Sequence, residues 1–85
     1  MTTLEPHDER LINEYNELNS RIKKLETVLF KIAINTCEFE PDSSYYTLQT
    51  QRDIMVSYRS ILEVRFDDIR LKRNINLFVY IKEET

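Results

Sequence analysis

Apolar residues recur along the first third of the chain at alternating steps of four and three, the spacing of a heptad repeat. Charged and amide side chains fill the positions between them, so a helix here would have one apolar face and one solvated face. Pro6, Asp8 and Glu9 are residues that the start of a helix favours. The pattern predicts a helix over residues 7–34. Its apolar seam would be Leu11, Tyr15, Leu18, Ile22, Leu25, Leu29 and Ile32.

A second helical pattern follows a break over residues 35–43, where Pro41 disfavours helix at the residue before it. Apolar spacing then predicts a helix over residues 44–71. The short connection predicts an antiparallel, coiled-coil-like hairpin of mainly α structure. Counted in steps of three and four, the seam of this second helix is Leu48, Gln51, Met55, Tyr58, Leu62, Arg65 and Ile69.

The second helix carries more apolar surface than a hairpin can cover. Ile54, Ile61 and Val64 form a flank beside the seam, and a partner helix on one side leaves this flank in water. An exposed apolar flank is typical of an interface between proteins. We therefore expect the chain to assemble as a homo-oligomer.

The last segment changes period. Within residues 74–82, Ile75, Leu77, Val79 and Ile81 alternate with Asn76, Phe78, Tyr80 and Lys82, and β-branched and aromatic side chains are frequent there. This pattern favours a short strand. A single strand cannot satisfy its own backbone, so the segment would pair with another copy, pack as an extended arm, or continue as helix.

Length and composition narrow the class of protein. Eighty-five residues form a single domain over residues 1–85, and the absence of glycine favours long helices over a turn-rich sheet. The net charge of −3 and a pI near 5.1 argue against binding DNA. No apolar run is long enough to cross a membrane and no signal peptide is evident, so an intracellular, soluble chain is expected.

Catalytic and metal-binding motifs are also missing from the sequence. Without glycine there is no phosphate-cradling loop and no dinucleotide fingerprint. His7 is the only histidine and Cys37 the only cysteine, which excludes an internal disulfide and a multi-cysteine zinc site. The acidic residues between positions 38 and 42 are expected to be solvated rather than to hold a cation. We therefore expect neither an enzyme nor a metal or cofactor site.

Basic, aromatic and amide side chains lie close to the first seam. Arg21, Lys24 and Lys31 follow Tyr15 and Asn16 along the first helix. An aromatic ring can stack on a base, an amide can read its edge, and cations can neutralise phosphate. With Tyr58 and Arg65 of the second helix, these residues are the predicted ligand-binding set.

Arg65 has two explanations at a seam position. A buried guanidinium is costly unless it is paired or reaches water. It could form a salt bridge with a carboxylate of the first helix such as Glu14, or extend its end to solvent. Alternatively, it could border a cavity between protomers that admits a phosphate. Gln51 allows the same two explanations.

Two stretches resemble a known family. "RLINEYNELNSRIKKLE" (residues 10–26) and "YTLQTQRDIMVSYRSILEVRF" (residues 46–66) are similar to the helical hairpin of bacteriophage anti-CBASS and anti-Thoeris sponge proteins. The polar positions Gln51, Tyr58 and Arg65 give the resemblance its specificity, and residues 74–82 do not belong to the pattern. The matching positions are Arg10, Glu14, Glu17, Leu18, Ile22, Leu25, Leu48, Gln51, Met55, Tyr58, Leu62 and Arg65.

The resemblance implies a non-enzymatic homo-oligomer, commonly a hexamer, that works in the cytoplasm of an infected bacterium. Such sponges bind cyclic di- or trinucleotides, or cyclic ADP-ribose isomers, between protomers and withhold them from the defence effector. The alternative is a coiled-coil structural or adaptor protein that binds another protein through the apolar stripe of the second helix.

Overall fold

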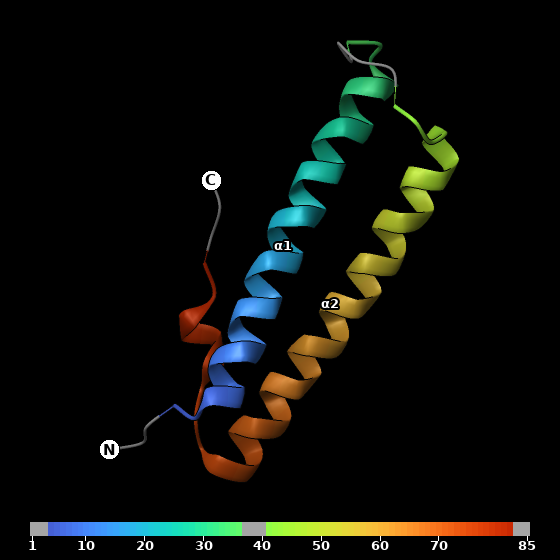
Figure 1. Cartoon of the computed structure of the whole chain (residues 1–85). Coiled ribbons are helices and arrows are strands. Elements are labelled where there is room, and N and C mark those ends of the chain that lie inside the picture. Colours follow the sequence, from blue (N-terminus) through green and yellow to red (C-terminus); the bar gives the residue numbers. More distant parts are fainter. Residues whose placement is uncertain (1–3, 37–40, 83–85) are drawn as a thin grey trace.

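Two long antiparallel helices form a rod-shaped hairpin in the computed structural model (Figure 1). The structure describes residues 4–36 and 41–82. Helix α1 spans Pro6–Ala33, helix α2 spans Tyr45–Arg73, and one turn of 3-10 helix, η1, spans Leu77–Tyr80. The prediction of a mainly α helical hairpin is confirmed. Cys37 and the acidic positions Glu38 and Glu40 lie outside the described residues.

Local signals define the ends of both helices. Glu5 is the N-cap of α1, and its backbone N–H donates to the Asp8 carboxylate over 2.9 Å. Ser44 caps α2 by accepting a hydrogen bond from the Thr47 backbone N–H at 3.2 Å. Asn74 ends α2 in the left-handed conformation with φ of 57°, which asparagine tolerates better than most residues.

The buried face of α1 is the one that its periodicity predicts. Leu25 and Ile32 are half-buried and the other five seam residues are buried. Tyr15 belongs to this core: its ring lies 5.3 Å from that of Phe66, and its hydroxyl donates to Glu63 at 3.0 Å. Burial is the main cause that raises the pKa of the Tyr15 hydroxyl, and the bond to Glu63 raises it further.

The buried face of α2 differs from the predicted seam at every second position. Gln51, Tyr58 and Arg65 are exposed, and their C-terminal neighbours Arg52, Arg59 and Phe66 face α1 instead. Phe66 is the reason for this rotation, because the face that buries its ring gains a large apolar contact and leaves the Arg65 guanidinium in water. The assignment of Arg65 to the seam is therefore wrong.

Other arginines occupy seam positions of α2, and each has a polar partner on α1. Arg52 lies 3.4 Å from Glu26, Arg59 donates to the Asn19 side-chain carbonyl at 2.7 Å, and Arg73 reaches Asp8. These pairs lie at successive levels of the hairpin, so a shifted register would leave half-buried guanidinium groups unpaired.

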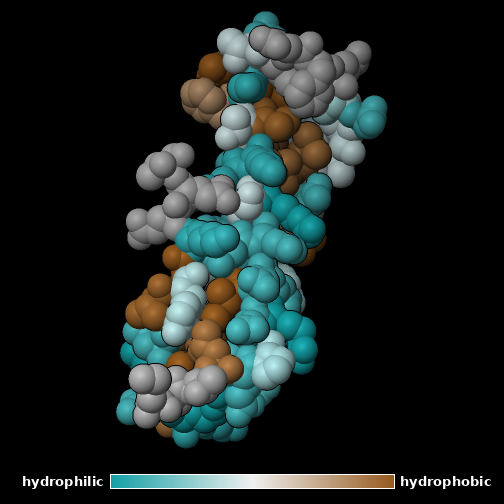
Figure 2. All heavy atoms as spheres, turned by 60° about the vertical axis from the view of Figure 1, so that its left-hand side comes forward, coloured by the Kyte–Doolittle hydropathy of each residue, from teal (hydrophilic) through white to brown (hydrophobic). Residues whose placement is uncertain are grey.

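The C-terminal segment packs back on the hairpin, and the strand alternative is wrong, because residues 74–82 contain no strand. Ile75 and Leu77 are buried, and the Phe78 ring meets Phe66 edge-on at 5.2 Å. Asn16 holds the returning backbone: its side-chain oxygen accepts from the Lys82 N–H at 2.9 Å, and its amide donates to the Tyr80 carbonyl at 3.4 Å. Figure 2 shows apolar atoms beside this segment, and a hydrophilic band separates them from apolar atoms at the loop end.

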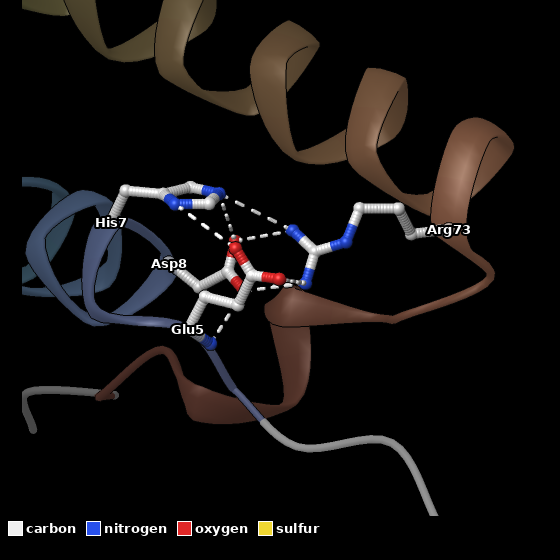
Figure 3. A network of polar contacts seen from close by, with 4 residues as sticks. All are labelled: Glu5, His7, Asp8 and Arg73. Carbon is white, nitrogen blue, oxygen red and sulfur yellow. Dashed lines mark hydrogen bonds and ion pairs between the residues drawn. The ribbon is translucent and has the colours of Figure 1, made fainter.

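An ion pair between a buried aspartate and a partly exposed arginine joins the open ends of the two helices (Figure 3). Arg73 donates to both carboxylate oxygens of Asp8, at 2.9 and 2.8 Å, and Asp8 is fully buried. His7 and Glu5 surround the pair, with His7 Nε2 3.4 Å from Asp8 and Glu5 4.0 Å from Arg73. The bonds from Arg73 are the main cause that holds the pKa of Asp8 below its ordinary value of 3.8, although burial opposes the shift.

Replacing Asp8 with asparagine is expected to lower the free energy of unfolding by about 1.5–3 kcal/mol at neutral pH, because one charge-assisted hydrogen bond from Arg73 is lost and the other is weakened. A carboxyl with a depressed folded-state pKa stabilises the fold above its unfolded pKa. That contribution disappears as the pH falls through the folded-state pKa. The difference between wild type and Asp8→Asn should therefore shrink below about pH 4. Urea titrations at pH 7 and pH 3 measure it, and a pH-independent difference would contradict the assignment.

Candidate functional site

One flank of the hairpin gathers most of the predicted ligand-binding residues. The Tyr58 hydroxyl donates a hydrogen bond to Glu14, which places these two residues side by side on α2 and α1. Residues seven apart share a helix face, so Arg21 lies on the Glu14 side of α1, and Gln51 and Arg65 lie on the Tyr58 side of α2. We call this surface the Tyr58 flank. It consists of Glu14, Arg21, Lys24, Lys31, Gln51, Tyr58 and Arg65.

The charges of the Tyr58 flank interact at its centre. The hydrogen bond to Glu14 is the main cause that raises the pKa of the Tyr58 hydroxyl, and the nearby charge of Arg65 acts in the opposite direction. Arg65 therefore lies within electrostatic reach of Tyr58, one heptad away on the same helix face. No ion pair between Arg65 and Glu14 forms in the described part of the chain.

The side chains of the cations on this flank are unpaired, whereas the other arginines of α2 have polar partners. Within residues 4–36 and 41–82, the side chains of Arg21, Lys24, Lys31 and Arg65 make no hydrogen bond or ion pair. The arginines elsewhere on α2 are engaged; Arg70, for example, lies 3.1 Å from Asp67. An acidic protein thus presents one flank whose arginine and lysine side chains are available to an anion.

Two shallow hollows lie along this side of α2. One of 370 Å³ is lined by Tyr46, Gln51, Ile54, Met55 and two threonines, Thr47 and Thr50. The other, of 220 Å³, is lined by Arg65, Asp68, Ile69 and Lys72. The first offers an aromatic ring, an apolar floor and the Gln51 amide, which suit a planar base, and the second offers cations that suit a phosphate.

Two predicted site residues lie elsewhere. Tyr15 is buried between the helices, so its ring is already packed against Phe66. The Asn16 side chain is bonded to the backbone of Tyr80 and Lys82 and holds the C-terminal segment. Conversely, sequence reasoning assigned Glu14 only as an ion partner for Arg65, and it did not identify the Asp8–Arg73 pair. The position of Glu14 one heptad before Arg21 was the only signal for its place on this flank.

The described residues offer neither a metal site nor a membrane segment. Within them, no three side chains of histidine, cysteine, aspartate or glutamate converge on one point. Neither long helix contains an apolar stretch that would span a bilayer.

Comparison with known families shows which family this chain belongs to. Residues 5–68 match the model of the Sequestin family, which is three-quarters of the chain. The chain is a member of the Sequestin family. Neither a curated protein nor a solved structure matches it.

The family name agrees with the sponge resemblance found in the sequence and suggests that a Sequestin sequesters a small molecule. The matched residues include all of the Tyr58 flank. Arg73 and the C-terminal segment that follows it lie beyond the match.

Proposed function

We propose that this Sequestin is a non-enzymatic sponge for cyclic oligonucleotide signals of CBASS- or Thoeris-type antiphage defence. Its ligand is a cyclic di- or trinucleotide or a cyclic ADP-ribose isomer, which it binds in the cytoplasm of the infected bacterium. The observation that carries the proposal is the unpaired cation set of the Tyr58 flank on a chain with a net charge of −3.

The chemistry of the flank supports a phosphate ligand that also carries bases. Arg65 and Arg21 can each donate two parallel hydrogen bonds to a phosphate, and Lys24 and Lys31 add positive charge. The half-exposed Tyr58 ring and the Gln51 amide supply a stacking surface and an edge reader for a base. The ligand is bound between protomers of a homo-oligomer such as a hexamer, because one open flank buries too little of a ligand to hold it tightly.

A sponge turns nothing over, so it works only at stoichiometric concentration and with tight binding. In this proposal no residue acts as an acid, base or nucleophile. The flank holds the signal intact and releases it when the protein unfolds. This property separates sequestration from degradation.

Thermal melting with a panel of cyclic di- and trinucleotides and cyclic ADP-ribose isomers tests the proposal. A ligand at 100 times its dissociation constant should stabilise the protein by about 2.7 kcal/mol. Heating the complex should then return the nucleotide chemically unchanged, as chromatography of the supernatant would show. No melting shift with any member of the panel would favour a protein-binding adaptor, and a cleaved nucleotide would show an enzyme.

A further inference from the structure

The outer face of α2 carries a second heptad stripe that α1 does not cover. All six of its residues are exposed to solvent. The three apolar residues have large exposed fractions: 64% for Ile54, 55% for Ile61 and 58% for Val64. Alternating steps of four and three connect these positions, which is the spacing by which one helix packs along another. We call this surface the outer stripe. It consists of Thr50, Ile54, Ser57, Ile61, Val64 and Asp68.

We propose that the outer stripe pairs with the outer stripe of a second copy, with the two α2 helices antiparallel. This inference rests on the proposed oligomer and specifies its contact. Helix α2 spans Tyr45–Arg73, so its midpoint is near residue 59. Antiparallel pairing about that point overlaps the helices over their full length. It sets Ile54 against Val64 of the second copy, and Ser57 against Ile61.

Charge selects the antiparallel direction. In a parallel pair each stripe residue faces its own counterpart, so two Asp68 carboxylates would meet within the seam and repel each other. In the antiparallel pair, Asp68 faces the hydroxyl of Thr50, which can donate a hydrogen bond to it. The stripe is thus self-complementary in only one of the two directions.

The direction also determines where the Tyr58 flanks lie. A two-fold axis across an antiparallel pair keeps both Tyr58 flanks on the same side, whereas the axis of a parallel pair would place them on opposite sides. In the antiparallel register, Arg65 of the second copy lies between Gln51 and Tyr58 of the first. The two copies therefore line one groove, and Arg65 of each copy adds a guanidinium beside Gln51 and Tyr58 of the other.

Cysteine cross-linking tests this arrangement in a Cys37→Ser background. Ile54→Cys and Val64→Cys proteins are prepared separately, mixed in equal amounts and mildly oxidised. The expected result is a disulfide-linked dimer in the mixture and almost none with either variant alone. Thr27→Cys, an exposed position on α1, replaces Ile54→Cys in the control mixture and should give no dimer with Val64→Cys.

Two results would overturn the inference. Cross-linking of each variant with itself would show parallel pairing, and a mixture that stays monomeric would show that the stripe does not pair with itself. Either result leaves the nucleotide-induced melting shift untouched, since that shift is measured on the wild-type protein. Conversely, if the mixture cross-links but no nucleotide stabilises the wild-type protein, the pairing of the stripes is supported and the sponge function is rejected.

Discussion

Phe66→Ala should lower the free energy of unfolding by about 3–5 kcal/mol, the largest stability loss expected from a single substitution in this chain. Phe66 of α2 is 0% exposed and contacts both of the other packed elements, α1 and η1. Its ring lies 5.3 Å from Tyr15 on α1 and 5.2 Å from Phe78 in η1. Alanine would leave a cavity where α1, α2 and the C-terminal segment meet.

Chemical denaturation at one fixed protein concentration measures this loss, because the stability of an oligomer depends on concentration. Phe30→Ala is the matched control, since it removes the same ring from a position that is 63% exposed. It should change stability by about 0.5 kcal/mol or less. Equal effects of the two substitutions would contradict the rotated α2 seam.

Arg65→Ala should weaken nucleotide binding about 10- to 100-fold, or about 1.4–2.8 kcal/mol, without unfolding the protein. The side chain is exposed and unpaired within the described residues, so its removal costs the fold little. In the proposed complex, the guanidinium donates to a phosphate in a groove partly shielded from water, where a charge-assisted hydrogen bond is strong.

Calorimetric titration with the nucleotide that gives the largest melting shift measures this effect. The control is Arg70→Ala, which removes an arginine from the same helix that is already paired with Asp67. Arg70→Ala should bind like the wild type. If both variants bind like the wild type, the ligand does not use the Tyr58 flank.

The sequence predicted α1 well and α2 only in part, for a physical reason. All seven seam positions of α1 carry apolar or aromatic side chains, so one register stands out. On α2, two registers share Leu48, Met55, Leu62 and Ile69, and they differ in whether residues 51, 58 and 65 or residues 52, 59 and 66 face α1. Arginine occurs in both registers, so its presence does not distinguish them. Burial of Phe66 against Tyr15 decides between them, and that contact joins residues far apart in the sequence.

For the C-terminal segment the sequence left a strand, an extended arm and a helix open, and only the strand, of which its alternation is typical, was wrong. No other described segment offers it a strand partner. Its apolar side chains pack on the hairpin instead, and the Asn76 side chain starts a 3-10 turn by accepting from the Phe78 N–H at 3.0 Å. The anchoring bonds from Asn16 span more than sixty residues of sequence, so no local pattern indicates them.

The candidate site was partly accessible from spacing. Helical period alone places Tyr58 with Arg65 on α2, and Arg21 with Lys24 and Lys31 on α1. The two sets lie on the same flank only because of the way the helices face each other. The Glu14–Tyr58 hydrogen bond establishes that orientation. Tyr15 carries the chemistry of a stacking residue, but its seam position places it in the core.

Native mass spectrometry of the purified protein, with and without an added cyclic dinucleotide or trinucleotide, shows whether the chain assembles and holds the nucleotide. The expected result is an assembly of several identical chains that retains the nucleotide at its unmodified mass. A monomer that retains no nucleotide from the panel would contradict it.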